Sequence, residues 1–270
     1  MDIRYGALII LFLVLNYVVS SVRWKKLLVH ANTEKVTLGY LTSLYFIGAF
    51  FNNFMPTSIG GDVYKIVKLG NKIGSKADAF SATFMERFTG MIALVFISLF
   101  GFIVTFLKGT GSNEFVLIGS VVLILFVVFG VSGFVGLKTL EIAKKKIAKL
   151  EKIYNSLMQY KGQNQVLFVA FLTSFIVQFL SIFTQYFIFV AIGVKLDIFK
   201  SLFIFPVITL ASFFIPSLNG IGVQDFLYKF SNIFLAINAP AAVASSILYH
   251  LFRLIVSLFG GVLYALGKDE

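Results

Sequence analysis

The sequence has no cysteine, only two histidines and few charged residues. Without cysteine the chain has no disulfide, no thiolate metal ligand and no cysteine nucleophile. Charged residues make up 13% of the chain, whereas a soluble domain carries roughly 25%. Such a chain has too little polar surface to face water on all sides, so the composition excludes an ordinary soluble enzyme.

Catalytic sequence motifs are also missing. His30 and His250 lie far apart, and no metalloprotease motif, nucleotide-binding loop, serine-hydrolase motif or carboxylate-rich metal motif occurs. We therefore expect no enzymatic activity and no cofactor or metal. The net charge is +11, which in a membrane protein is more typical of topology signals and lipid contact than of nucleic-acid binding, so no nucleic-acid partner is expected.

Long hydrophobic runs dominate the sequence. Hydrophobic residues make up 59% of the chain, and a helical run of about 18 residues or more crosses a hydrocarbon core of roughly 30 Å. The alternation typical of membrane strands is absent, so we predict an all-α, polytopic integral membrane protein of the inner (plasma) membrane. The hydrophobic regions cover approximately residues 5–22, 38–55, 86–107, 115–137, 166–194, 199–216 and 241–267.

The first hydrophobic region also has the length of a secretory signal peptide. Arg4 is the only basic residue before it, however, and no small-residue cleavage site follows it. The residues that do follow, Arg23 and Trp24 and then two lysines, are typical of a stop-transfer anchor with a tryptophan at the membrane interface. We therefore expect this region to remain as a transmembrane helix.

Lysine and arginine gather in three segments, which the positive-inside rule places in the cytoplasm. These segments are 23–35, 65–76 and 138–161. Region 38–55 lies between the first two, so it must begin and end on the same side. A re-entrant hairpin that enters the membrane and returns resolves this conflict, and its tip from Asn52 to Asp62 is rich in helix breakers. This topology places the N-terminus outside and the C-terminus in the cytoplasm.

The second half contains a similar interrupted region. Region 199–216 runs into a Phe-x-Pro segment that is followed by polar residues, glycines and Asp225, as in the first hairpin. Two interrupted segments in corresponding halves are typical of an inverted repeat. We predict one transmembrane domain over 1–270, with about five full spans and two re-entrant helical hairpins. An amphipathic cytoplasmic helix over 138–161 would link the two halves.

Polar features inside these hydrophobic regions are candidates for binding. Backbone N–H groups at the two glycine-rich tips can hold an anion, although a structural helix break also explains the glycines. Glu86 and Arg87 point in different directions on one helix, so each needs its own partner or reaches interfacial water. Arg253 lies in the middle of its helix, with His250 one turn earlier, and we expect it to face an acidic side chain or a lipid phosphate. The candidate acids are Asp62, Glu86 and Asp225.

The spacing of these motifs resembles a known family. The set consists of Asn53-x-x-Pro56, Gly60-Gly61-Asp62, Glu86-Arg87, and Pro216 with Gly220-x-Gly222-x-x-acid. It resembles the lysylphosphatidylglycerol synthase transmembrane family, also called flippase-like, over nearly the whole chain. This chain departs from the family pattern at Lys65 and Gln224, where the family tends to have arginine. Lysine keeps the charge at the first position but loses bidentate phosphate pairing, and glutamine loses the charge at the second.

The resemblance implies a protein that moves a lipid with a charged headgroup between leaflets. In bifunctional relatives the aminoacyl transfer belongs to a separate soluble domain, and a chain that ends at Glu270 has no room for one, so we expect a stand-alone member without that activity. The expected partner is a membrane phospholipid or polyprenyl-linked lipid. The alternatives are a polyprenyl-phosphate or lipid-modifying transferase, or an accessory subunit of such an enzyme. The candidate substrate-binding residues are Asn53, Pro56, Thr57, Gly60, Gly61, Asp62, Lys65, Glu86, Arg87, Asn219, Gly220, Gly222, Asp225, His250 and Arg253.

Overall fold

The computed structural model describes most of the chain as helices joined by short loops. The described residues are 3–29, 36–55, 60–111, 148–215, 217–235 and 237–268, with some positions between 113 and 142. No strand occurs among them. The helices are α1 (Ile3–Leu27), α2 (Leu38–Asn52), α3 (Gly60–Ile73), α4 (Lys76–Leu107), α6 (Ala148–Met158), α7 (Asn164–Ala191), α8 (Ile198–Phe214), α9 (Val223–Phe230), α10 (Asn232–Leu235) and α11 (Ala239–Ala265).

Four long helices form the frame of the molecule. Helices α1, α4, α7 and α11 are each long and hydrophobic enough to cross a membrane, and α7 packs against the other three. Their exposed positions carry large hydrophobic residues such as Leu11, Phe100, Ile176 and Phe259, which suit contact with lipid. The prediction of an all-α, polytopic membrane protein is therefore confirmed. The predicted span over 115–137 lies mostly outside the described residues.

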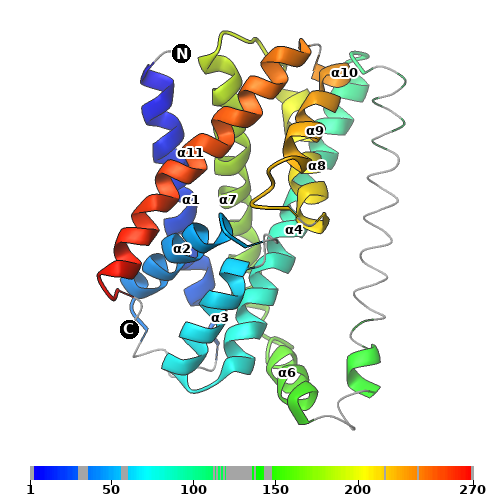
Figure 1. The fold of residues 1–270 in the computed structure, drawn as a ribbon. Coiled ribbons are helices and arrows are strands. Elements are labelled where there is room, and N and C mark those ends of the chain that lie inside the picture. The colour runs from blue at the N-terminus through cyan, green and yellow to red at the C-terminus, as the bar shows by residue number, and fades with distance from the viewer. Residues whose placement is uncertain are drawn as a thin grey trace.

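Two helical hairpins fill the space inside this frame (Figure 1). Helix α2 runs from the end of the bundle at which α11 finishes to about halfway along it, and α3 runs back to that end. Helix α8 runs from the opposite end, at which α1 begins, to about halfway, and α9 runs back toward that end. Hence the two breaks in hydrophobicity that the sequence shows both lie at mid-height, and the hairpins point toward each other.

Close backbone contacts hold α2 in place. A Cβ atom added to Gly61 of α3 would lie 2.2 Å from the carbonyl oxygen of Gly48 in α2. On the other side of α2, a Cβ atom added to Gly260 of α11 would lie 2.0 Å from the carbonyl oxygen of Phe46. Small residues permit such approaches between helices in a membrane, where dispersion contacts and hydrogen bonds drive packing. The glycines therefore let α2 lie tightly between α3 and α11.

Helix α4 begins about ten residues earlier than the hydrophobic pattern indicates. Its first residue is Lys76, and the hydroxyl group of Ser75 caps it by accepting a 3.2 Å hydrogen bond from the N–H of Asp78. The first turns of α4 are less hydrophobic than the rest of the helix, and α4 packs against α3 and α6. The prediction that Glu86 and Arg87 open this helix is therefore wrong, and both residues lie well inside it.

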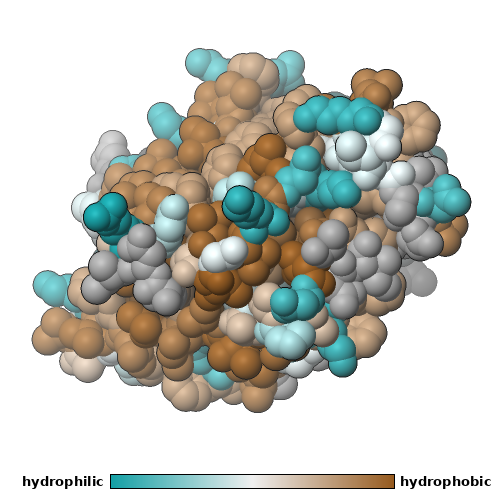
Figure 2. Space-filling view, turned by 90° about the horizontal axis from the view of Figure 1, so that it is seen from above, coloured by the Kyte–Doolittle hydropathy of each residue, from teal (hydrophilic) through white to brown (hydrophobic). Residues whose placement is uncertain are grey.

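The described part of the predicted amphipathic helix, α6, packs against α4. The hydroxyl of Ser156 donates to Asp78 over 2.6 Å, and the hydroxyl of Tyr160, just after α6, donates to the carbonyl of Leu27 over 2.6 Å. These bonds fix α6 at the end of the bundle where α1 finishes. Its role as a linker between two halves stays a prediction. At the other end, shown in Figure 2, hydrophilic residues are interspersed among hydrophobic ones.

Candidate functional site

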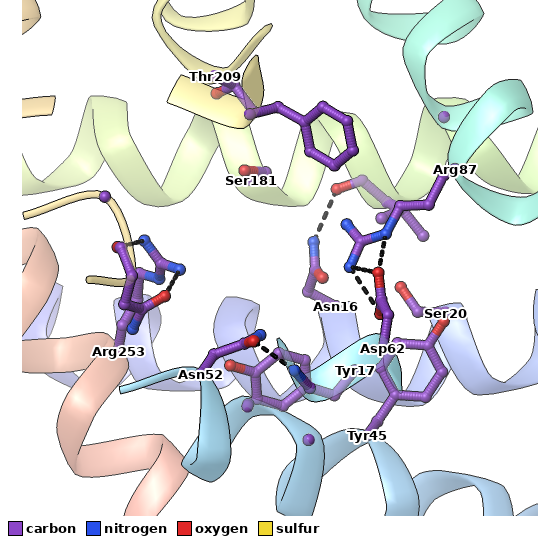
Figure 3. A pocket seen from close by; sticks show the side chains of 18 of the residues that line it. Asn16, Tyr17, Ser20, Tyr45, Asn52, Asp62, Arg87, Ser181, Thr209 and Arg253 are labelled. Atoms are coloured by element: carbon purple, nitrogen blue, oxygen red, sulfur yellow. Dashed lines mark hydrogen bonds and ion pairs between the residues drawn. The ribbon is translucent and has the colours of Figure 1, made fainter. Parts of the chain in front are cut away.

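A cavity of about 280 Å³ lies at the centre of the bundle, where the two hairpin tips meet the long helices. Every long helix and both hairpins contribute side chains to its wall. Asparagine, glutamine, serine and tyrosine side chains line much of the wall (Figure 3). The charged residues that line it are Arg23, Asp62, Lys65, Glu86, Arg87 and Arg253.

Most of these charges form one network on the side of α1, α3 and α4. Arg87 donates two hydrogen bonds to the carboxylate of Asp62, from Nε over 2.8 Å and from Nη2 over 2.9 Å. The ammonium of Lys65, one turn along α3, lies 2.9 Å from the same carboxylate. Arg23 of α1 donates to Glu86 over 2.7 Å. Each carboxylate therefore has at least one close cation.

The exposure of these side chains separates Arg87 from the others. Arg23, Lys65, Asp62 and Glu86 are each at most 5% exposed, so their charges depend on partners within the protein and not on water. The side chain of Arg87 keeps 41% of its surface exposed although it lies at mid-height in the bundle. Figure 3 shows this guanidinium beside the open space, so its free surface faces the cavity.

The order of residues along α4 explains how one helix serves two partners. Neighbours on a helix point about 100° apart. Glu86 therefore points toward Arg23, and Arg87 points toward Asp62 on α3. The prediction that these two residues need separate partners is confirmed. Tyr45 of α2 also donates its hydroxyl to Glu86, and the Lys65 ammonium lies 3.9 Å from the centre of the Tyr45 ring.

Arg253 of α11 lies on the opposite side of the cavity, and its environment differs. Its Nη1 atom donates to the carbonyl of Asn219 over 3.2 Å and to the side-chain oxygen of Gln224 over 3.4 Å. Its Nη2 atom donates to the side-chain oxygen of Asn219. Among the described residues no carboxylate pairs with it. Of the two partners expected for Arg253, an acidic side chain is not found in the described part of the chain, and a lipid phosphate stays a prediction.

The candidate acids are engaged elsewhere. Asp62 and Glu86 belong to the network across the cavity, as described above. Asp225 turns back toward its own helix, α9, where it accepts a 2.8 Å hydrogen bond from the N–H of Gly222. Its carboxylate also accepts from Ser246 and lies 3.3 Å from Nε2 of His250. This cluster does not belong to the cavity wall.

Asparagine side chains join the two hairpin tips. The amide of Asn219 donates to the side-chain oxygen of Asn53 over 2.6 Å, and Asn53 in turn donates to Ser257 of α11 over 2.8 Å. Asn219 has φ 50°, a left-handed conformation that asparagine adopts more readily than most residues. This backbone turns both oxygens of Asn219, from its carbonyl and from its side chain, toward Arg253.

The structure brings about half of the predicted site residues together. Those that line the cavity are Gly61, Asp62, Lys65, Glu86, Arg87, Asn219, Gly220 and Arg253. Asn53 lies next to it through its bond to Asn219. Gly60, Gly222, Asp225 and His250 do not belong to its wall. Pro56 and Thr57 lie outside the described residues.

Sequence reasoning missed Arg23 and Tyr45. The sequence predicts a cytoplasmic position for Arg23 and an interfacial position for Trp24. The structure buries both side chains against other helices, and Trp24 is fully inaccessible. Trp24 therefore packs inside the protein, and its depth at the membrane interface stays a prediction. Arg23 lies within α1, before the lysines that end it, and Glu86 provides its counter-charge. An acid in a hydrophobic helix needs a cation, and that is the only signal in the sequence that points to Arg23.

The fold and the cavity define a multi-pass helical membrane protein with a charged centre. The chain belongs to the family of the lysylphosphatidylglycerol synthase TM region, whose model matches residues 1–261. It is also similar to the UPF0104 membrane protein PH1989 of Pyrococcus horikoshii, with 24% identity over 300 residues that cover 97% of this chain and 87% of that protein. No solved structure matches the chain. Family membership indicates a role related to membrane lipids.

Proposed function

We propose that the protein moves a lipid with a charged headgroup between the leaflets of the cell membrane. The observation that carries this proposal is the meeting of two oppositely directed hairpins at a charged cavity halfway along the bundle. A headgroup that crosses hydrocarbon alone loses its hydration, which is the main barrier to spontaneous exchange. Fixed charges and amide groups at mid-height replace part of that hydration.

The proposal assigns the hairpins a re-entrant position in the membrane. The α2–α3 hairpin enters from the cytoplasm and the α8–α9 hairpin enters from outside, so each tip blocks the path from one side. A headgroup reaches the cavity when one tip shifts, and the lipid tails stay in the bilayer. Transporters with inverted repeats place their binding sites at such interrupted helices near the midplane.

The predicted topology has a direct test. The chain contains no cysteine, so single cysteines can be introduced without removing any. Asn71 at the end of α3 and Lys195 before α8 are both exposed. In intact cells a membrane-impermeant thiol reagent should label Lys195→Cys and not Asn71→Cys. Labelling of Asn71→Cys from outside would make α2 a full span and refute the re-entrant arrangement.

The proposed activity is tested with purified protein in liposomes that contain a trace of acyl-labelled phospholipid. A quencher that reaches only the outer leaflet removes about half of the signal from sealed empty liposomes, because the inner leaflet is protected. Liposomes with the protein should lose nearly all of the signal. A parallel reaction with nucleotide sugars and a polyprenyl phosphate tests the transferase alternative. Glycolipid formed without lipid exchange would favour an enzyme. The absence of both glycolipid formation and lipid exchange would favour an accessory subunit.

A further inference from the structure

The charges that line the central cavity do not balance. Four cationic side chains, Arg23, Lys65, Arg87 and Arg253, face two carboxylates, Asp62 and Glu86. Among the described residues, the wall therefore carries two positive charges in excess. The network beside α4 contributes one of them, because the two carboxylates there neutralise only two of the three cations. Arg253 contributes the other, since amide oxygens are its only hydrogen-bond partners in the described part of the chain.

An uncompensated charge at this depth requires a counter-charge. The penalty for an isolated ion in a low-dielectric interior is large, and an intramembrane arginine is retained for a partner or a water-filled cavity. Amide oxygens orient Arg253 without neutralising it. Arg87 keeps free surface toward the cavity even after its bidentate bond to Asp62. Both guanidinium groups therefore remain available to an anion.

Both arginines line the same cavity, so an anion held there lies between two cationic groups. Figure 3 shows Arg87 and Arg253 on opposite sides of the open space, on α4 and α11. A cavity of about 280 Å³ has room for a phosphate group together with water. Guanidinium groups match the geometry of phosphate oxygens and hold them by bidentate hydrogen bonds.

We infer that the cavity binds a phosphate that carries two negative charges, as in a lipid phosphomonoester such as phosphatidic acid or a polyprenyl phosphate. This inference rests on the proposed function and deepens it by naming the class of headgroup. A dianion neutralises the two excess charges. A phosphodiester with one negative charge compensates half of them, and a zwitterionic headgroup compensates none. A headgroup with a net positive charge would add to the excess, so the site disfavours it.

The test compares lipids that differ only in the headgroup. Binding of acyl-labelled phosphatidic acid, phosphatidylglycerol and phosphatidylcholine, with identical acyl chains, is measured on the full-length protein in detergent. The pH is about 8, so that the phosphomonoester is dianionic. Phosphatidic acid should bind at least about tenfold more tightly than phosphatidylglycerol, a ratio that corresponds to one charge-assisted hydrogen bond. Inorganic phosphate and glycerol phosphate serve as soluble competitors, and both should compete weakly.

Two variants connect the preference to the cavity. Arg253→Gln should reduce the preference for phosphatidic acid to below about threefold, because one excess charge is lost, and it breaks no ion pair. Lys161→Gln removes one charge from an exposed position at the end of the bundle and should leave the tenfold ratio unchanged. A tenfold ratio retained in Lys161→Gln shows that the total charge of the protein does not set the preference.

Each other outcome is decisive. Equal affinity for phosphatidic acid and phosphatidylglycerol, or a ratio that Arg253→Gln leaves intact, overturns the inference. Displacement of the lipid by inorganic phosphate at similar concentration makes free phosphate the ligand and overturns the lipid source. Liposome exchange of all lipids at equal rates, with equal affinities, leaves the proposed function standing and removes the dianion preference. The tenfold preference without any exchange keeps the binding site and refutes translocation.

Discussion

Two arginines at the ends of the central cavity are held in different ways. Arg87 forms a bidentate bond with Asp62, which Lys65 also contacts. Arg253 is oriented by the amide oxygens of Asn219 and Gln224. One guanidinium therefore has a permanent counter-charge, and the other has only dipoles. Removal of a charge should destabilise the fold on the first side, and it should mainly change ligand binding on the second.

The comparison also shows how the site couples to the hairpins. The charged network joins the α2–α3 hairpin to α4, whereas the asparagine pair joins its tip to the α8–α9 hairpin. Buried ion pairs tolerate the loss of one partner poorly, while neutral hydrogen bonds are weaker and exchange more readily. We therefore expect the α3–α4 side to stay rigid. The contact between the two tips is the part that can open.

The largest expected effect on stability is that of Asp62→Asn. The substitution leaves Arg87 and Lys65 without their close carboxylate, and loss of one partner from a buried ion pair costs ~3–5 kcal/mol. The measurement is the unfolding free energy of the purified protein in detergent. Glu151→Gln, at an exposed position on α6, is the matched control and should change stability little. A loss below about 1 kcal/mol for Asp62→Asn would show that both arginines are held by dipoles alone.

The second prediction concerns the backbone that positions Asp62. In Gly61→Ala the new methyl group would lie 2.2 Å from the carbonyl oxygen of Gly48, so α2 and α3 must separate. Overpacking of this kind costs ~1–3 kcal/mol, and it should also move Asp62 away from Arg87. Gly39→Ala in α2 is the control, because no atom lies within 4 Å of its added Cβ.

If Gly61→Ala and Gly39→Ala prove equally stable and equally active in lipid exchange, close packing of α3 on α2 is not required. The ion pairs alone would then determine the position of the first hairpin. The expected result is a loss of both stability and exchange for Gly61→Ala only.

The third prediction concerns the tip contact. Asn53→Ala removes the hydrogen bonds to Asn219 and Ser257, and its net cost should be about 1 kcal/mol because both bonds are uncharged. The rate of lipid exchange should rise, since the two tips separate more easily. Asn71→Ala at the exposed end of α3 is the control. A slower rate at unchanged stability would mean that the tip bond assists the lipid and does not restrain it.

The sequence predicted the helices and both hairpin breaks because hydropathy and helix breakers are local signals. The long runs correspond to α1, α4, α7 and α11, and the glycine-rich breaks lie at mid-height. It also indicated Arg253, because a charge in the middle of a hydrophobic helix stands out from its neighbours. The sequence alone therefore predicted which segments form the long helices and approximately where the candidate site lies.

The ion-pair and hydrogen-bond partners of the site residues could not be predicted, because they depend on how distant segments pack. Arg23 lies next to a basic run that reads as a cytoplasmic signal, yet α1 and α4 pack so that it meets Glu86. The amide partners of Arg253 depend on the left-handed turn at Asn219, which hydropathy does not report. The early start of α4 was signalled by Ser75 and Asp78, the N-cap pattern that precedes its less hydrophobic first turns.

The smallest expected effect on stability, and the largest on function, is that of Arg253→Gln. Its partners are neutral oxygens that a glutamine amide can also reach in part, so the loss should stay below about 1 kcal/mol. Lipid exchange in liposomes should nevertheless fall at least about tenfold, because the excess charge that attracts the headgroup is gone. Arg253→Lys keeps the charge but lacks the planar guanidinium group, so its exchange rate should lie between those of the parent protein and Arg253→Gln.

A different result would remove the distinction between the two arginines. If Arg253→Gln destabilises the protein as strongly as Asp62→Asn, then Arg253 has a structural role. Its hydrogen bonds to amide oxygens would then be enough to stabilise the fold. If Arg253→Gln folds normally and exchanges lipid at the rate of the parent protein, the headgroup passes without using this side of the cavity. Measuring exchange and unfolding on the same preparations separates these cases, because only a ligand-binding role lowers the first and spares the second.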